Sequence, residues 1–215
     1  MEPLDPVAVR VLGSLMEKEV TVPDNYPLTL NSLLAACNQT TNREPVMSLT
    51  ESAVADSVKD LMRLNLVREV VRSDSRTKRF RQSLSEVKSL HPPEAALLCV
   101  LMLRGAQTTG ELRSRTARMF EFADLRHVEV TLQALMTLDP PLVREMTRRP
   151  GQKETRYAHL LAGEPVEEPV TTVEEPQSGP TQAERLEMLE RTVESLQSQM
   201  EELRTRFEEF RREFQ

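Results

Sequence analysis

The side chains in this sequence that could do chemistry are the basic ones, because the usual catalytic and metal-binding patterns are missing. The three histidines (His91, His127 and His159) show no metal-ligand spacing to one another or to Cys37 and Cys99. The sequence has neither a glycine-rich phosphate loop nor a Gly-x-Ser-x-Gly motif. We therefore expect no catalytic residue, no cofactor and no metal, and a protein that is not an enzyme.

Two clusters of basic side chains have the composition of a phosphate-contacting surface. Each lies within or beside two short runs of β-forming residues, so a β-hairpin would carry the positive charge. Lysine and arginine there could neutralise DNA phosphates without reading the base sequence. The alternative is that hairpin tips are exposed and polar in any protein. The candidate DNA-binding residues are Arg72, Arg76, Lys78, Arg79 and Arg81 in the first cluster and Arg148, Arg149, Lys153 and Arg156 in the second.

The elements that would position these clusters occur twice. An amphipathic helix precedes the strand-like residues 66–72, a polar break and a second extended run at 77–84. The same order returns at residues 128–138, 142–145 and 154–161, and a shift of 86 residues aligns residues 4–16 with 90–102. The helical stripes are Val54, Val58, Leu61 and Leu64 in the first copy and Val128, Leu132, Leu135 and Leu138 in the second.

This duplication predicts a fold that is mainly α with small β-hairpin wings (α+β). We expect two tandem winged helix-turn-helix domains, at residues 1–88 and 89–162, followed by a C-terminal coiled-coil helix. Side chains suited to capping the N-termini of helices mark several predicted helix starts. These are Asp5 before Pro6, Thr29, Thr50, Thr108 with Glu111, and Asp124.

The helices that would enter the major groove have charges poorly suited to reading bases. The first carries Glu51, Asp56 and Asp60 against Lys59 and Arg63. The second carries Asp124 and Glu129 against Arg126 and His127. Carboxylates beside phosphates are repelled, so strong sequence-specific recognition through either helix is not expected.

The sequence changes character after residue 162. Residues 1–162 carry 22 basic and 20 acidic side chains, whereas residues 163–215 carry 6 and 14. Residues 163–181 are rich in Pro and Glu, which predicts a flexible linker. Residues 182–215 follow a heptad pattern that predicts a coiled coil and a homodimer; the alternative is an amphipathic helix that folds back onto the body. The seam consists of Leu186, Leu189, Val193, Leu196, Met200, Leu203, Phe207, Phe210 and Phe214.

The two cysteines lie in separate apolar runs, which predicts buried free thiols in a reducing compartment. The sequence has no signal-peptide pattern and no apolar run of membrane-spanning length. We therefore expect a cytoplasmic protein with no membrane partner.

Several motifs resemble the bacterial YceH family of uncharacterised proteins. The resemblance covers residues 4–162 and implies two winged-helix domains, but it supplies no chemistry. The heptad segment lies outside it. The motifs are Asn25-Tyr26-Pro27-Leu28, Ala36-Cys37-Asn38-Gln39, residues 41–47 (TNREPVM), residues 103–108 (LRGAQT), residues 110–115 (GELRSR) and Arg118-Met119.

Two polar stretches, residues 38–45 and 108–118, occupy equivalent positions in the copies and could form one composite surface. A purely structural alternative is that Asn42 and Glu44 bond loop backbone groups and Arg113 pairs with a carboxylate beside Glu111. The candidate surface residues are Asn42, Arg43, Glu44, Arg113, Arg115 and Arg118.

Two functions remain open from the sequence. The first is a dimeric transcription or chromosome-associated factor that contacts DNA, non-specifically or with weak specificity, through basic wings. The second is a protein–protein adaptor that uses the same scaffold and coiled coil without nucleic acid and binds an unknown protein partner. Fold alone does not decide between them.

Overall fold

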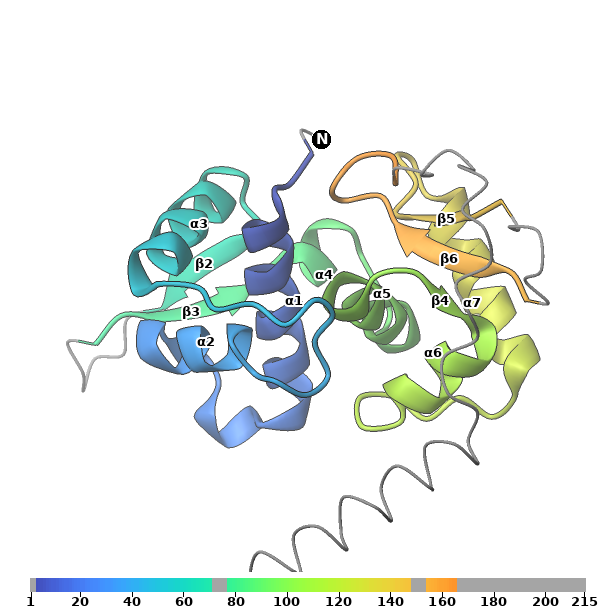
Figure 1. Ribbon diagram of the computed structural model, residues 1–215, viewed down its shortest axis with the longest axis horizontal. Helices are drawn as coiled ribbons and strands as arrows, with labels where there is room; N and C mark the ends of the chain where they lie inside the picture. Colours follow the sequence, from blue (N-terminus) through green and yellow to red (C-terminus); the bar gives the residue numbers. More distant parts are fainter. Residues whose placement is uncertain (1–2, 71–76, 148–153, 166–215) are drawn as a thin grey trace, which may run out of the picture. The chain divides into compact units, whose positions relative to one another are not determined.

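The computed structural model describes residues 3–70, 77–147 and 154–165 (Figure 1). These residues belong to one compact unit, Met1–Val166. Seven α-helices and two small antiparallel sheets make up this described part, which is mainly helical. The predicted coiled coil at 182–215 and all but the first residues of the predicted linker lie outside the described residues.

The first repeat has the element order helix, short strand, helix, helix, strand, strand (blue to cyan-green in Figure 1). Its sheet has the order β1-β3-β2, with Val67 opposite Gln82 and Leu28 opposite Phe80. The elements are α1 (Pro6–Thr21), a 3-10 turn η1 (Pro23–Asn25), β1 (Leu28–Thr29), α2 (Leu30–Cys37), α3 (Glu51–Arg63), β2 (Val67–Val70) and β3 (Arg79–Gln82).

The second repeat has the same order of helices and strands. Its sheet order, β4-β6-β5, is equivalent to that of the first, with Gln107 opposite Tyr157 and Val143 opposite His159. A short helix, α4 (Leu84–Val87), connects the repeats. The elements are α5 (Pro92–Arg104), β4 (Gln107–Thr108), α6 (Thr109–Thr116), α7 (Leu125–Thr137), β5 (Val143–Glu145) and β6 (Arg156–His159).

The predicted helix starts are confirmed, because each capping side chain accepts a hydrogen bond from the first turn. The Asp5 carboxylate accepts from the backbone N–H of Ala8 at 2.8 Å, and Thr108 and Glu111 form a capping box. The remaining caps are Thr29 on α2, Thr50 on α3 and Asp124 on α7.

Other details differ from the prediction. The strands β1 and β4 were not predicted, because two residues are too short to show alternation. The strands β3 and β6 are shorter than the extended runs predicted at 77–84 and 154–161, and Leu84 begins α4 instead. Leu64 was assigned to the buried stripe of α3, but it lies just past the end of that helix and is 37% exposed.

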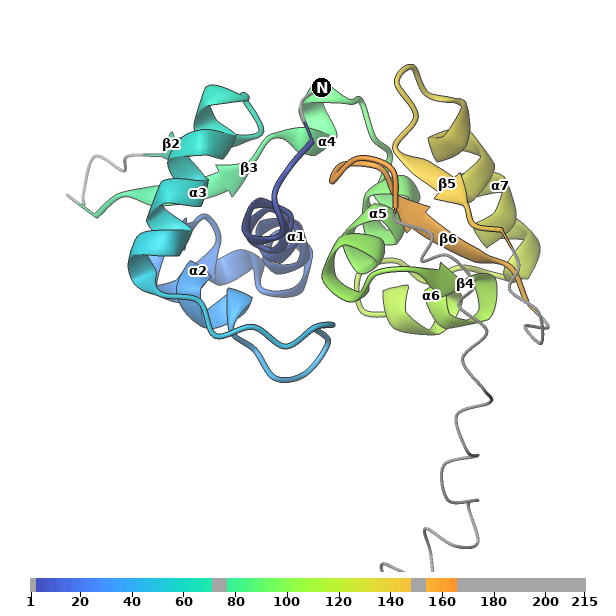
Figure 2. The same ribbon diagram turned by 45° about the horizontal axis from the view of Figure 1, so that its top comes forward.

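One hydrophobic core runs through both repeats, and α1 and α5 pack against each other at its centre (Figure 2). The contact is close because Gly13 of α1 has no side chain. A Cβ atom on Gly13 would lie 3.0 Å from Leu103 Cδ2 and 3.3 Å from Met102 Cβ, both on α5. The Cys99 thiol donates to the Gly13 carbonyl at 3.3 Å, and these two residues are 86 positions apart, the offset of the duplication.

The two cysteines are buried and free, as predicted. Burial raises the pKa of each thiol, which keeps it protonated. Within the described ranges, no helix combines the length and apolar composition that crossing a bilayer requires.

Replacing Gly13 should disrupt the contact between the repeats. We expect Gly13→Val to lower the free energy of unfolding by about 1–3 kcal/mol, because the added atoms overpack a closed helix interface. Chemical denaturation followed by circular dichroism measures this. Gly110→Val is the matched control, because the nearest atom to its added Cβ is 3.9 Å away, and we expect a change within about 0.5 kcal/mol. Equal losses in the two variants would contradict the close-packed interface.

Candidate nucleic-acid interface and arginine cleft

The described basic side chains of the first hairpin all have partners within the protein. Lys78 donates to Glu69 at 3.1 Å, and Arg81 pairs with Glu86. Arg79 donates to the Pro27 carbonyl at 2.9 Å and so ties β3 to the chain before β1. The side chain of Lys78 is 69% exposed. Because an exposed ion pair contributes at most about 1 kcal/mol, a DNA phosphate could take the place of the Glu69 carboxylate as the partner of Lys78.

The second hairpin contributes one described candidate, Arg156. Its guanidinium donates to the Ala106 carbonyl at 3.0 Å and lies 3.8 Å from Glu111, which ties β6 to the start of α6. The other candidates lie outside the described residues. These are Arg72 and Arg76 of the first cluster and Arg148, Arg149 and Lys153 of the second.

Neither α3 nor α7 has an excess of positive charge: α3 carries three carboxylates against two cations, and α7 carries Arg126 against Glu129. On α3, Lys59 pairs with Asp56 at 2.7 Å and Arg63 pairs with Asp60. On α7, Arg126 and Glu129 are both exposed. The apolar side chain of Val130, on the same helix, is 63% exposed. Neither helix therefore presents a net positive face to a phosphate backbone.

A cluster of buried polar side chains lies under the loop of residues 38–49, which joins α2 to α3. Arg43 is fully buried at its side chain and pairs with Glu17 of α1 at 2.6 Å. Its Nε and Nη2 atoms also donate to the Ala36 carbonyl, at 3.1 and 3.0 Å. The last carbonyls of a helix have no partner within the helix, and a cation near that end is favoured. Arg43 therefore closes the C-terminal end of α2.

A second buried arginine completes this closure. Arg10 of α1 donates to the Cys37 carbonyl at 3.2 Å and to the Pro45 carbonyl at 2.6 Å. Asn38 exchanges two hydrogen bonds with the backbone of Leu49, at 2.9 and 2.8 Å. The loop is thus held at both ends and near its middle.

The buried Arg43–Glu17 pair also shifts the pKa values of Glu17 and of the neighbouring Arg10. Burial raises the pKa of Glu17, but the hydrogen bond and charge of Arg43, together with Lys18 at 3.2 Å, outweigh burial and hold that pKa below its ordinary value. Burial lowers the pKa of Arg10, with the nearby charge of Arg43 acting in the same direction.

The loop extends from the first repeat to the second. The backbone N–H of Glu44 donates to the Leu103 carbonyl at 2.8 Å, near the end of α5. Arg104, the last residue of α5, donates to the side-chain oxygen of Asn42. Asn42 has a φ of 59°, a left-handed conformation that asparagine tolerates better than most residues.

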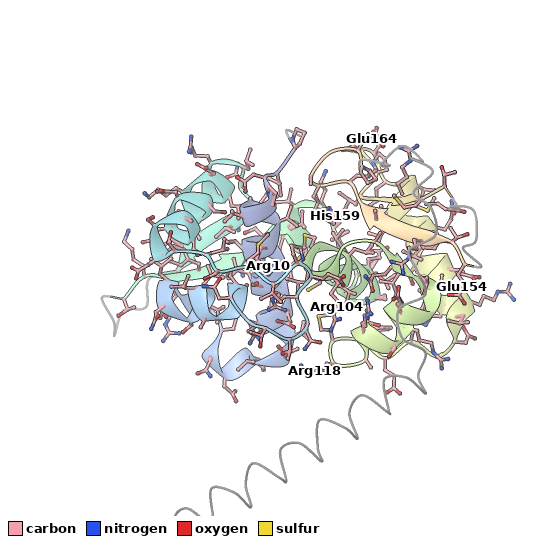
Figure 3. All side chains as sticks on the ribbon, viewed as in Figure 1. Arg10, Arg104, Arg118, Glu154, His159 and Glu164 are labelled. Atoms are coloured by element: carbon pink, nitrogen blue, oxygen red, sulfur yellow. The ribbon has the colours of Figure 1, made fainter. Side chains whose placement is uncertain are left out.

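These contacts build a cleft between the repeats that we call the arginine cleft. Three cationic side chains of the second repeat line it: Arg104 at the end of α5, Arg115 in α6 and Arg118 just after α6. Figure 3 labels Arg104 and Arg118 near the junction of the two repeats. The other lining residues are Glu17, Thr21, Asn42, Val100, Leu103 and Met119.

The predicted composite surface is found in part. Asn42, Arg115 and Arg118 share the arginine cleft, which brings the two polar stretches together. Glu44 is exposed on the loop beside it. Arg43 lies in the interior and offers no surface.

Arg113 is exposed but does not line the arginine cleft, and it bonds to backbone carbonyls where a carboxylate partner was the structural alternative. Its guanidinium donates to the carbonyls of Phe122 and Ala123, at 3.4 and 2.9 Å, and so fixes the chain between α6 and α7. Within α6, Glu111 pairs with Arg115 at 3.4 Å, because the spacing of four residues places the two on one face of the helix; Arg156 of β6 approaches the same carboxylate at 3.8 Å.

Sequence reasoning missed Arg10, Glu17 and Arg104. The sequence does offer a clue to the first two, because each is a charged residue next to apolar residues of the first helix: Arg10 between Val9 and Val11, and Glu17 after Met16.

Among the described residues, no group of three His, Cys, Asp or Glu side chains could hold a metal ion. Burial lowers the pKa of His159 to about 4, so this histidine is neutral at pH 7.

Comparison with known proteins places the chain in a family. Residues 4–152 match the family described as "Protein of unknown function, DUF480". A UPF0502 protein of Geobacter sulfurreducens is 52% identical over 162 residues, which cover 75% of this chain and 74% of that protein. A UPF0502 protein of Paraburkholderia phymatum is 50% identical over 162 residues, covering 75% of this chain and 68% of that protein. The chain belongs to this DUF480/UPF0502 family of uncharacterised bacterial proteins, which confirms the kind of family that the motifs indicated.

Breaking the ion pair between Arg43 and Glu17 should destabilise the protein and detach the loop of residues 38–49. We expect Arg43→Met to lower the free energy of unfolding by about 3–5 kcal/mol, because Glu17 is left buried without its main partner. The double variant Glu17→Gln with Arg43→Met should recover part of this loss. Denaturant unfolding measures both.

The matched control is Lys59→Met, which breaks an ion pair whose side chains are 68% and 67% exposed. We expect it to cost less than about 1 kcal/mol. An Arg43→Met protein as stable as the Lys59→Met protein would show that the buried pair does not anchor the loop.

Proposed function

We propose that this member of the DUF480 family is a DNA-binding protein built from two tandem winged helix-turn-helix domains, residues 1–88 and 89–162. The observation that supports this most is the shared element order, in which three helices and a three-stranded antiparallel sheet recur with equivalent strand order. In such domains the third helix faces the major groove and the hairpin contacts the backbone. Here α3 and α7 are the third helices, and the β2–β3 and β5–β6 hairpins are the wings.

The proposed contact is electrostatic and weakly specific. The helix α3 carries three carboxylates (Glu51, Asp56 and Asp60) against two cations, so base recognition by that helix is not supported. The hairpins instead contribute basic residues between their strands, including Arg72, Arg76, Arg148, Arg149 and Lys153. Contacts of this kind bind many sequences with similar affinity and weaken steeply with salt. We propose a transcription or chromosome-associated role and no enzymatic activity.

We also propose that residues 182–215 form a coiled coil that makes the protein a homodimer, with residues 163–181 as the linker. A dimer would carry four winged domains, and weak contacts would then reinforce one another through effective concentration. The buried free thiols support a reducing, cytoplasmic location.

A second candidate is a protein–protein adaptor that does not bind nucleic acid. The exposed apolar side chains of α7 favour it, because Leu125 is 45% exposed and Val130 is 63% exposed on a helix with no net charge advantage. A partner that buries these residues would compete with any DNA contact by α7.

Fluorescence anisotropy with random-sequence duplex DNA across a salt series separates the two candidates. We expect binding that falls steeply with salt, and we expect neutralising Arg148, Arg149 and Lys153 together with glutamine to weaken it about equally on all sequences and to reduce the salt slope. The control is the Lys59→Gln/Arg63→Gln variant, which removes two cations that are already paired on α3. No binding at low salt would reject the DNA role and favour the adaptor.

A comparison of the full chain with a truncated protein of residues 1–162 tests the dimer. Sedimentation should give a dimeric mass for the full chain and a monomeric mass for the truncated protein, which should also bind DNA more weakly. A truncated protein that is still dimeric would contradict the role given to residues 182–215.

A further inference from the structure

The arginine cleft holds more positive charge than its carboxylates neutralise. Of the carboxylates nearby, Glu17 is already engaged by Arg43 at 2.6 Å and Lys18 at 3.2 Å, and Glu111 pairs with both Arg115 at 3.4 Å and Arg156 at 3.8 Å. The remaining carboxylate, Glu44, acts on Arg104 through its charge alone, so the cations still outnumber the carboxylates. Arg104 has an amide oxygen as its hydrogen-bond partner, which supplies no charge. Arg118 is exposed and makes no ion pair or hydrogen bond with any residue that the structure describes.

The crowding of like charges is visible in the ionisation of Arg104. Burial lowers the pKa of this guanidinium and the positive charge of Arg115 lowers it further; together these outweigh the opposing charges of Glu44 and Glu17. Cations held near one another repel, so the arrangement costs free energy unless an anion lies between them. An anion bound in the cleft would remove that cost.

Two of the three guanidiniums, those of Arg104 and Arg115, are held in place by groups that belong to the two different repeats. Asn42 fixes Arg104, and Asn42 is itself held in the loop that Arg43 and Arg10 anchor. Glu111 fixes Arg115, and the capping box with Thr108 in turn orients Glu111. Side chains oriented before a ligand arrives lose less conformational entropy on binding.

The dimensions of the cleft restrict what can enter it. Its volume is about 30 Å³, room for roughly two waters, so a phosphate group would contact the arginines at the mouth of the cleft and would not enter it fully. A nucleobase or a whole sugar does not fit. Arginine guanidinium groups bind phosphate oxygens with two parallel hydrogen bonds, which makes them the preferred partners of phosphate.

We infer that the arginine cleft is a binding site for a single phosphate group, contacted by Arg104, Arg115 and Arg118. The phosphate could belong to a nucleic-acid backbone or to a free phosphate-bearing small molecule. Both present a tetrahedral group of anionic oxygens, with one negative charge in the backbone and one or two on a terminal phosphate. The site differs from the hairpins, and it does not require that the protein bind DNA. If DNA does bind, the cleft adds a contact at the junction of the repeats.

NMR of the isotope-labelled full chain, titrated with inorganic phosphate against chloride at constant ionic strength, tests this inference. We expect saturable shifts of the side-chain Nε–H signals of Arg104, Arg115 and Arg118. We expect Arg118→Gln and Arg115→Gln each to weaken phosphate binding by roughly tenfold or more, since each removes charge-assisted hydrogen bonds. Arg118→Gln should leave stability unchanged, because that side chain has no partner among the described residues.

Lys88→Gln is the control, because it removes one positive charge from a residue that does not line the cleft and should leave phosphate affinity unchanged. Shifts that do not saturate, or that persist unaltered in Arg118→Gln and Arg115→Gln, would overturn the inference. Anisotropy with duplex DNA on the same variants then identifies the source of the phosphate. Weaker DNA binding by Arg118→Gln than by Lys88→Gln assigns the site to a nucleic-acid backbone, whereas equal binding, or none by any variant, assigns it to a free ligand.

Discussion

The buried ion pair between Arg43 and Glu17 is the interaction on which the rest of this structure depends. Two charges removed from water are tolerated only when geometry and additional hydrogen bonds compensate for the lost solvation. Here the guanidinium also satisfies the end of α2 and the carbonyl of Asn42. One side chain therefore couples the first helix, the second helix and the loop that follows.

That coupling holds the loop through which the first repeat contacts the second. The repeats meet through α1 and α5, where Gly13 permits close approach, and through the loop, where Glu44 bonds to Leu103. The first contact is apolar and holds the helices together. The second places a polar loop of one repeat beside the arginines of the other, so the arginine cleft exists only because both contacts are made. A duplicated fold has thereby gained a feature that neither copy contains alone.

The sequence predicted the elements that depend on local chemistry. Capping side chains such as Asp5 and Thr108 bond to backbone groups three residues away, so their effect is visible in the sequence. The hairpins were predictable from short runs of β-forming residues, and the free cysteines from their positions in two separate apolar runs. The strands β1 and β4 were not, because each exists only through pairing with a strand about fifty residues distant.

For the arginine cleft, the sequence predicted some of the residues but not how they come together. The sequence identified Arg115 and Arg118 as part of a basic stretch, but not Arg104, whose position follows from the packing of α5 against the loop. Arg43 could not be separated from surface arginines, because its burial depends on Glu17, which is 26 residues away in the sequence. Long-range polar pairing of this kind leaves no periodic pattern.

Hydrogen exchange at the Glu44 amide tests the central claim most directly. Glu44 is an exposed residue whose N–H donates across the repeats to Leu103, so protection of this amide reports the docking of the loop. We expect slow exchange in the wild-type protein and exchange at least about tenfold faster in Arg43→Met, with the Gly105 amide on α5 as the reference that stays protected. Equal protection of Glu44 in the two proteins would contradict the account, because the loop would then dock without the buried ion pair.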